Sequence, residues 1–209
     1  MQSGRFSPGP HEYLTGRVAE FRVRLPVSPL NKKHMIFYIL ILLGVLTRVL
    51  PHSPNFTAVA AAALFSGYYI KNKKLAFAVP IVIMLLSDWK LGFYQWQIMA
   101  SVYASFAVVA LLGILIKNKK WYFALPTSLA GTIIFFLVTN YAVWQFGTWY
   151  PRTFAGLVES MAAGIPFVKN SFAGDLMYTF VLFSVAELAV YFARKSKPAV
   201  AKLIAGDRV

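Results

Sequence analysis

Residues 98–120 read IMASVYASFAVVALLGILIKNKK, and this stretch decides the fold class. The part up to Ile116 contains no charged residue and approaches the roughly 20 residues that a helix needs to cross a bilayer. The cluster Lys117-Asn118-Lys119-Lys120 closes it abruptly. An apolar run followed by basic residues is typical of a transmembrane helix that ends at the cytoplasmic surface. The stretch therefore predicts an integral membrane protein.

The composition of the whole chain agrees with this prediction. Hydrophobic residues make up 58% of the 209 positions and charged residues 13%, against about 25% charged in a typical soluble domain. The net charge is +14, but the basic residues lie in short clusters between apolar runs, which favours orientation in a bilayer over nucleic-acid binding. The absence of cysteine excludes disulfides, thiolate nucleophiles and Cys-ligated metal sites.

Further apolar segments lie on both sides of this run, so the sequence predicts an all-α protein with six transmembrane helices. We expect a flexible basic tail over residues 1–34, the transmembrane domain over 35–197 and a C-terminal tail over 198–209. Met35 follows a polar, basic stretch and is a second possible start of the natural chain. The other predicted spans are 35–50, 56–70, 75–91, 121–146 and 172–193.

Basic clusters at every second boundary predict the orientation of the helices. They lie at residues 32–33, 71–74, 117–120 and 194–197. Because basic loops are retained on the cytoplasmic side, this alternation places both termini in the cytoplasm of a cell whose plasma (inner) membrane the chain crosses. The polar residues between the basic clusters then face outward.

The last outer segment, residues 147–174, is too long for a simple turn. Apolar residues from Phe154 to Ala162 recur at helical spacing, which predicts a short amphipathic helix bracketed by Pro151 and Pro166. It is either a lid over an outward cavity or a helix lying in the interface, and loops of this length favour the lid.

Polar and aromatic residues gather at the predicted outer end. For the aromatic residues, anchoring at the lipid headgroups is the simplest interpretation. A charge inside an apolar helix is costly unless it is paired or faces a cavity, so we expect Arg48 to pair with Asp88 or Asp175, with ligand contact equally open. The residues of this outer group that are candidates for ligand binding are Arg48, His52, Asn55, Asp88, Asn140, Trp144, Arg152 and Asp175.

Two further features each allow two interpretations. Glu187 lies inside an apolar helix, where an acid suggests a proton site or partner contact, but it is also close enough to the predicted cytoplasmic edge to reach water. Ala58 and Ala62 are four residues apart and permit close helix approach, within the chain or against another membrane protein. No catalytic, nucleotide-binding or metal-binding motif is present, so we predict no cofactor.

The chain contains several distinctive motifs: Arg48-Val49-Leu50-Pro51-His52-Ser53-Pro54-Asn55-Phe56-Thr57, Leu85-Leu86-Ser87-Asp88, Thr139-Asn140-Tyr141-Ala142-Val143-Trp144, Ile165-Pro166-Phe167 and Gly174-Asp175. They resemble those of a family of uncharacterised small bacterial membrane proteins, over about residues 36–193. That family is similar in size and helix count to the substrate-binding S components of energy-coupling-factor (ECF) vitamin transporters, including solitary cobalamin-type members.

The resemblance implies a transport component that binds a vitamin or precursor in an outward-facing cavity, driven by a separate membrane coupling subunit with ATPases. It implies that the outer polar group contacts the solute, and that Ala58 and Ala62 form a coupling surface, although S components often carry such a motif on their first helix. His52 would have to replace a cysteine as a cobalamin ligand.

Two rival interpretations stay open. One is a membrane enzyme acting on a lipid-linked substrate at the outer interface, with Asp88, Asp175 or His52 as acid–base groups and Arg48 or Arg152 holding a phosphate. The other is a structural subunit of a membrane complex, which needs no enclosed pocket. The residues specify neither the substrate, nor the energy source, nor the oligomeric state.

Overall fold

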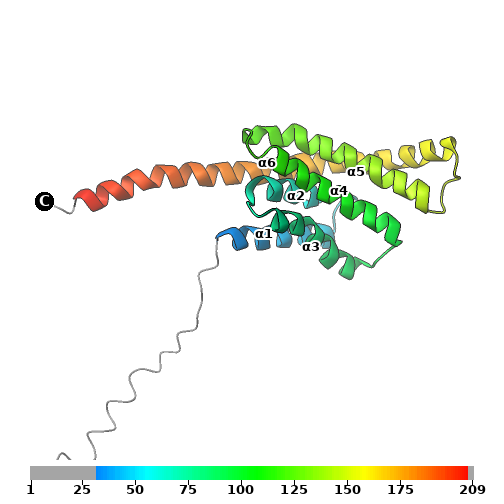
Figure 1. Ribbon diagram of the computed structural model, residues 1–209, viewed down its shortest axis with the longest axis horizontal. Helices are drawn as coiled ribbons and strands as arrows, with labels where there is room; N and C mark the ends of the chain where they lie inside the picture. The colour runs from blue at the N-terminus through cyan, green and yellow to red at the C-terminus, as the bar shows by residue number, and fades with distance from the viewer. Residues whose placement is uncertain (1–31, 207–209) are drawn as a thin grey trace, which may run out of the picture. The chain divides into compact units, whose positions relative to one another are not determined.

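The computed structural model describes the backbone of residues 32–206, so most of the predicted 1–34 tail and residues 207–209 lie outside the described part. This part contains helices and connections and no strand, which confirms the all-α class. The elements are α1 (Lys32–Val49), α2 (Val59–Tyr69), α3 (Lys73–Leu91), α4 (Trp96–Leu115), the short 3₁₀ helix η1 (Trp121–Phe123), α5 (Ala124–Phe146) and α6 (Phe154–Gly206) (Figure 1).

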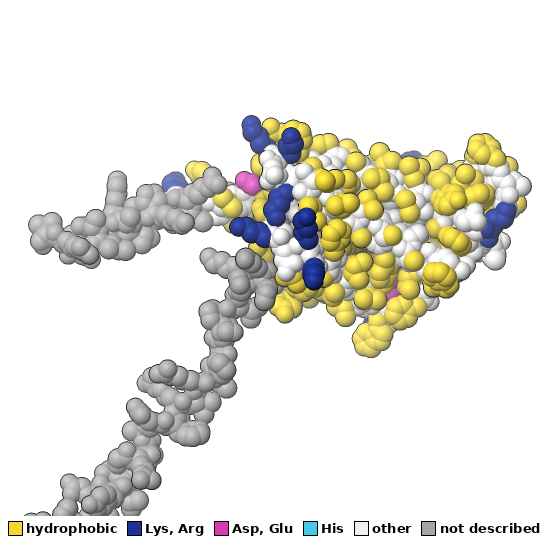
Figure 2. Space-filling view, in the orientation of Figure 1, with side chains coloured by type: hydrophobic (Ala, Val, Ile, Leu, Met, Phe, Trp, Pro, Cys, Tyr) yellow, Lys and Arg dark blue, Asp and Glu magenta, His cyan; other side chains and the backbone are white. Residues whose placement is uncertain are grey.

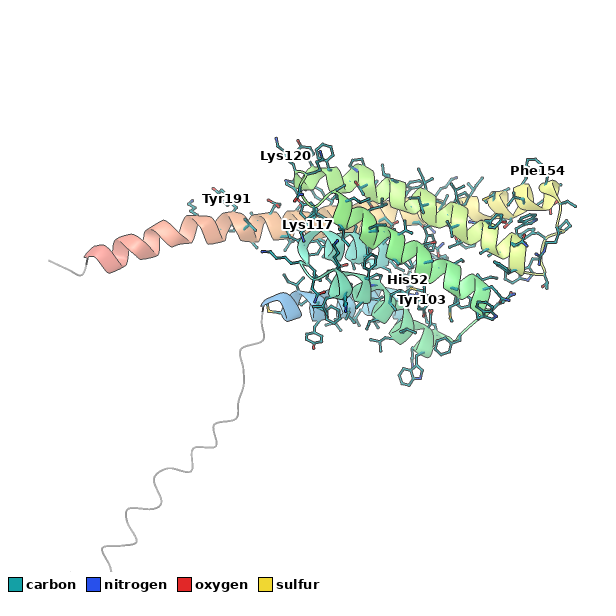
Figure 3. All side chains as sticks on the ribbon, viewed as in Figure 1. His52, Tyr103, Lys117, Lys120, Phe154 and Tyr191 are labelled. Atoms are coloured by element: carbon teal, nitrogen blue, oxygen red, sulfur yellow. The ribbon has the colours of Figure 1, made fainter. Side chains whose placement is uncertain are left out.

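Successive helices run in opposite directions, so α1 begins and α6 ends at the same end of the bundle (Figure 1). The lysine-rich connections lie at this end, where Figure 2 shows basic side chains gathered and Figure 3 labels Lys117 and Lys120. The Tyr68 hydroxyl donates to the Lys119 carbonyl at 2.7 Å and ties the α4–η1 connection to the end of α2. One end of the bundle is therefore basic, and the α3–α4 and α5–α6 connections form the other.

Three helical segments are long and apolar enough to cross a membrane: Trp96–Leu115, Trp121–Phe146 and Phe154–Phe192. The apolar helices Met35–Val49 and Val59–Tyr69 are shorter. Large apolar side chains such as Leu42, Leu115 and Val185 are exposed, and they cover the visible face of the bundle (Figure 2). An apolar surface of this extent suits a lipid environment, because soluble proteins rarely expose contiguous apolar patches so large.

The short helix α2 forms the centre of the bundle and contacts all five other α-helices. Every residue from Val59 to Gly67 except Ala60 is buried. Gly67 and Gly113 bring α2 and α4 into backbone contact, since a Cβ on Gly113 would overlap the Leu64 carbonyl oxygen. Small residues on α2 thus allow neighbours to approach from every side.

This burial also decides the role of Ala58 and Ala62 in this structure. Both are fully buried within the chain, so they serve internal packing and form no accessible coupling surface. The second helix is also shorter than the predicted 56–70. Pro51 and Pro54 disfavour helical backbone before them, and Asn55 has a left-handed φ of 62°, so residues 50–58 form a connection.

The prediction of a separate amphipathic helix ending at Pro166 is wrong. Residues from Phe154 onward form one helix, α6, which passes through Pro166 without a break. Proline costs a single backbone hydrogen bond there, and apolar helices packed against neighbours tolerate it. The connection between α5 and α6 therefore shrinks to residues 147–153, and no independent lid segment lies there.

Candidate functional site

A cavity of about 440 Å³ lies at the end of the bundle away from the lysine-rich connections. Space is left at this end because α2 is short: its 11 residues extend only about 16 Å at 1.5 Å per residue. The α1–α2 connection is therefore recessed, while the α5–α6 turn projects further (Figure 1). The lining residues come from all six α-helices and two connections: Arg48, His52, Asn55, Thr57, Val59, Ala60, Met84, Leu91, Tyr94, Val102, Phe106, Phe135, Ser171 and Asp175.

The structure brings four of the eight predicted ligand-binding residues to this cavity: Arg48, His52, Asn55 and Asp175. They come from α1, the α1–α2 connection and α6, which are far apart in the sequence. A fifth, Asp88, is not among the lining residues but bonds directly to Arg48. The cavity is thus built around the polar group that the sequence places at this end.

Arg48 and Asp88, on α1 and α3, form one of the two ion pairs that the sequence leaves open. Arg48 Nη2 donates to Asp88 Oδ1 at 2.7 Å, and Arg48 Nη1 contacts Met84 Sδ. The hydroxyl of Tyr103 on α4 donates to the other carboxylate oxygen, Oδ2, at 2.9 Å. Asp88 is 1% exposed and Arg48 18% exposed. The carboxylate is therefore fully occupied by protein donors, while the guanidinium still reaches the cavity.

Asp175 lies on α6, on the wall formed by α5 and α6. It is 6% exposed, and Thr132 Oγ1 donates to its Oδ2 atom at 2.6 Å. One helical turn further along, Thr179 donates to Ser128 at 3.2 Å. These hydroxyl contacts hold α5 and α6 together and fix the orientation of the carboxylate.

The α1–α2 connection supplies the polar rim of the cavity. His52 is exposed, and its Nδ1 atom lies 2.6 Å from the Leu50 carbonyl oxygen. Asn170 Nδ2 donates to the Pro54 carbonyl at 3.0 Å and fastens the connection to α6. Asn55 adopts its left-handed backbone at the rim, a conformation that asparagine tolerates better than most residues.

Tyr94, in the α3–α4 connection, adds a hydroxyl to the lining. Burial and the nearby Asp88 carboxylate raise the pKa of Tyr94 to about 12. Its hydroxyl therefore stays protonated at neutral pH and can both donate and accept a hydrogen bond.

Asn140 lines a smaller hollow of about 120 Å³ instead. This hollow shares Asn55, Phe135 and Ser171 with the main cavity, so the two are adjacent. Asn140 Nδ2 donates to the Phe136 carbonyl at 2.8 Å within α5. The side-chain carbonyl oxygen of Asn140, Oδ1, accepts no hydrogen bond from the described residues.

Trp144 and Arg152 do not line either hollow. Trp144 Nε1 donates to the Pro151 carbonyl at 2.9 Å, and Arg152 Nη2 donates to the Gly147 carbonyl at 3.1 Å. Both side chains therefore satisfy carbonyl groups of the α5–α6 turn. Their position indicates a structural role in closing that turn.

Glu187 lies towards the lysine-rich end, where the Tyr69 hydroxyl donates to its Oε1 atom at 3.0 Å. It is partly exposed and takes no part in the cavity. Within residues 32–206, no group of three or more His, Asp or Glu side chains is arranged to hold a metal ion.

Sequence reasoning missed several residues of the site. Spacing along a helix could have found some of them. Ser171 lies four residues before Asp175, and Val102 lies four residues before Phe106, so the members of each pair share a helix face. Thr132 carries no such signal, because an uncharged hydroxyl in an apolar helix is commonplace. The other missed residues are Thr57, Val59, Ala60, Met84, Leu91, Tyr94, Tyr103 and Phe135.

Comparisons with known proteins agree with the uncharacterised nature of the family expected from the sequence. Neither a curated protein nor a solved structure matches the chain. A family model described as a family of unknown function (DUF6580) matches residues 28–200. Since that match covers most of the 209 residues, the chain belongs to the family of unknown function DUF6580.

Proposed function

We propose that this protein is a membrane transport component that binds a small solute, a vitamin or a precursor, in the cavity at the end of the bundle away from the lysines. In this proposal all six helices belong to the membrane domain, and the lysine-rich connections and both termini lie in the cytoplasm. The cavity then opens to the outside of a bacterial plasma membrane. The observation that carries the proposal is the cavity itself, which gathers polar residues from four separate segments of the chain.

The size and lining of the cavity support a small organic solute. Its volume of about 440 Å³ falls within the roughly 300–1,000 Å³ of typical ligand pockets. Seven of its fourteen lining residues are apolar, among them Val102 and Phe106, and the other seven carry polar groups, so the lining can supply both affinity and orientation. A corrinoid, with its macrocycle and nucleotide loop, exceeds this volume, so a smaller vitamin or precursor fits better.

The shortness of α2 is compatible with six membrane segments. A helix that faces lipid must extend across the hydrocarbon core, which takes about 20 residues. Helix α2 is shielded by its five neighbours and buries nearly every residue, so the lipid does not set its length. Its polar connection faces the cavity, which is where irregular backbone is tolerated at membrane depth.

The likeness to ECF S components rests on size, helix count and this outward cavity. The chain has no nucleotide-binding motif, so a separate membrane subunit with ATPases would supply the energy. Because Ala58 and Ala62 are buried, such a subunit would contact the apolar outer faces of the bundle.

The two rival functions have less support. An enzyme of this kind needs several acid–base groups that converge on one point. Both oxygens of Asp88 accept hydrogen bonds from protein donors and His52 lies at the exposed rim, so Asp175 is the one candidate that keeps a carboxylate oxygen without a donor among the described residues. A purely structural subunit needs no cavity, whereas this end of the bundle contains one of about 440 Å³.

The orientation can be tested by cysteine labelling, because the natural chain has no cysteine. In intact cells, a membrane-impermeant maleimide should label His52→Cys, at the exposed rim, whereas Lys119→Cys should react only after permeabilisation. The unsubstituted chain is the control for background labelling. The reverse pattern would place the cavity in the cytoplasm and exclude uptake from outside.

A further inference from the structure

Asp175 is an acidic cavity residue without a basic partner. Among the described residues the one salt bridge joins Arg48 to Asp88, so the guanidinium nearest to the site is already neutralised. Asp175 lines the same cavity and is 6% exposed. The two sides of the cavity therefore differ: one holds a neutralised ion pair and the other a single carboxyl group.

The hydrogen bonds of Asp175 are incomplete. Thr132 donates to Oδ2 at 2.6 Å, while no described residue donates to Oδ1. A carboxylate removed from water is costly unless it is paired or well supplied with donors, and one hydroxyl provides little compensation. The cavity wall thus has an unfilled position for a positively charged donor.

Two aromatic rings line the same cavity as Asp175. Phe135 is three residues beyond Thr132 on α5, so the two side chains share a helix face. The ring of Phe106, on α4, packs against the ring of Phe135, with the two ring centroids 4.9 Å apart. Both rings line the cavity. Aromatic faces attract ammonium groups and also bury the apolar body of a solute.

We propose that the solute is an organic cation with an apolar or aromatic body. Its ammonium group donates to Asp175 Oδ1, and its body packs against Phe106 and Phe135. This inference rests on the proposed solute-binding function and names the class of solute. The Arg48–Asp88 pair adds no net charge, so the carboxylate of Asp175 decides the charge preference.

The test uses the purified full chain in detergent and three solutes of similar size that differ in charge: tryptamine, tryptophol and indole-3-propionate. Calorimetry should show tryptamine binding at least about tenfold more tightly than tryptophol, the gain expected from one charge-assisted hydrogen bond. Asp175→Asn keeps an oxygen for Thr132 and should abolish this preference while leaving tryptophol affinity within about threefold. Glu159→Gln removes an exposed acid of the same helix, outside the cavity, and should change neither affinity.

Benzyltrimethylammonium provides a second cationic probe, whose charge is fixed but which cannot donate a hydrogen bond. It should bind in preference to neutral tryptophol, because its positive charge is still attracted to the carboxylate of Asp175. It should lose affinity in Asp175→Asn, which removes that negative charge. If Asp175→Asn does not fold, the order of affinities in the unsubstituted protein decides the question.

Equal or tighter binding of tryptophol or indole-3-propionate would overturn the cation inference and leave solute binding intact. Tryptamine affinity unchanged by Asp175→Asn would also overturn it. If none of the four probes binds, the cation inference is likewise wrong. The solute-binding function itself is judged separately, with neutral and anionic vitamins.

Discussion

Arg48 of α1 donates through Nη2 to Asp88 of α3 at 2.7 Å, in the wall of a cavity and with the carboxylate 1% exposed. This bond joins two helices that contact each other along the bundle. It also leaves the guanidinium at the cavity surface. One contact thus stabilises the bundle and shapes the candidate site.

Breaking this pair from one side should be costly. Asp88→Ala leaves the guanidinium uncompensated in a partly buried position, and we expect a loss of about 3–5 kcal/mol in unfolding free energy. The double substitution Arg48→Met with Asp88→Leu removes both charges and should cost less than the sum of the two single substitutions. Denaturant unfolding in detergent measures the unsubstituted protein, Asp88→Ala, Arg48→Met, Asp88→Leu and the double variant. Strict additivity of Arg48→Met and Asp88→Leu would show that the bond contributes no coupling.

Gly113 should tolerate no side chain. A Cβ there would overlap the Leu64 carbonyl oxygen, which is backbone and cannot move aside alone. Gly113→Ala should therefore destabilise the protein by about 1–3 kcal/mol through overpacking. Leu115→Ala, on the outer face of the same helix, is the control and should stay within about 0.5 kcal/mol in a thermal unfolding series. Equal effects of the two substitutions would contradict the close approach of α2 and α4.

Trp144 should matter for stability and not for solute binding. Trp144→Phe removes the hydrogen bond to the Pro151 carbonyl but keeps an aromatic ring, so we expect a loss of about 1 kcal/mol. The affinity for any solute of the cavity should stay the same, because Trp144 is not among its lining residues. A large loss of affinity with unchanged stability would restore Trp144 as a ligand contact.

Replacing Tyr103 by phenylalanine tests the support of the ion pair. The hydroxyl donates to Asp88 Oδ2, and its removal leaves that buried oxygen without the donor, at a cost of about 1–3 kcal/mol. Tyr122→Phe, at an exposed position near the lysine-rich end, is the matched control and should have no measurable effect. If the two variants have the same melting temperature, Tyr103 does not support the Arg48–Asp88 ion pair.

Much of the architecture followed from simple physical rules. Apolar runs closed by lysine clusters predicted the helices, and the cost of a charge in an apolar helix predicted that Arg48 pairs with Asp88 or Asp175, of which the structure shows Asp88. Hydropathy alone does not separate a lipid-facing helix from a buried one, so the shortness and central position of α2 were not foreseen. The continuity of α6 through Pro166 was missed because the cost of a proline depends on its neighbours.

The site was predicted in part for related reasons. Charged residues and asparagine are rare in apolar segments and therefore easy to recognise, which is why Arg48, Asn55 and Asp175 were predicted. Arg152 is also charged and Trp144 is an aromatic residue of the same outer group, but both side chains donate to carbonyl groups of a turn, which no spacing rule reveals. Thr132 supplies the donor to Asp175 from another helix, and such contacts between distant segments require the structure.

The central claim is that the cavity binds a small solute, and thermal unfolding of the purified protein against a panel of vitamins and their precursors tests it most directly. A solute at 100 times its dissociation constant should stabilise the folded protein by about 2.7 kcal/mol. We predict a saturable increase in melting temperature for at least one member, which Arg48→Ala abolishes. No shift with any member, in protein shown to be folded, would contradict the claim.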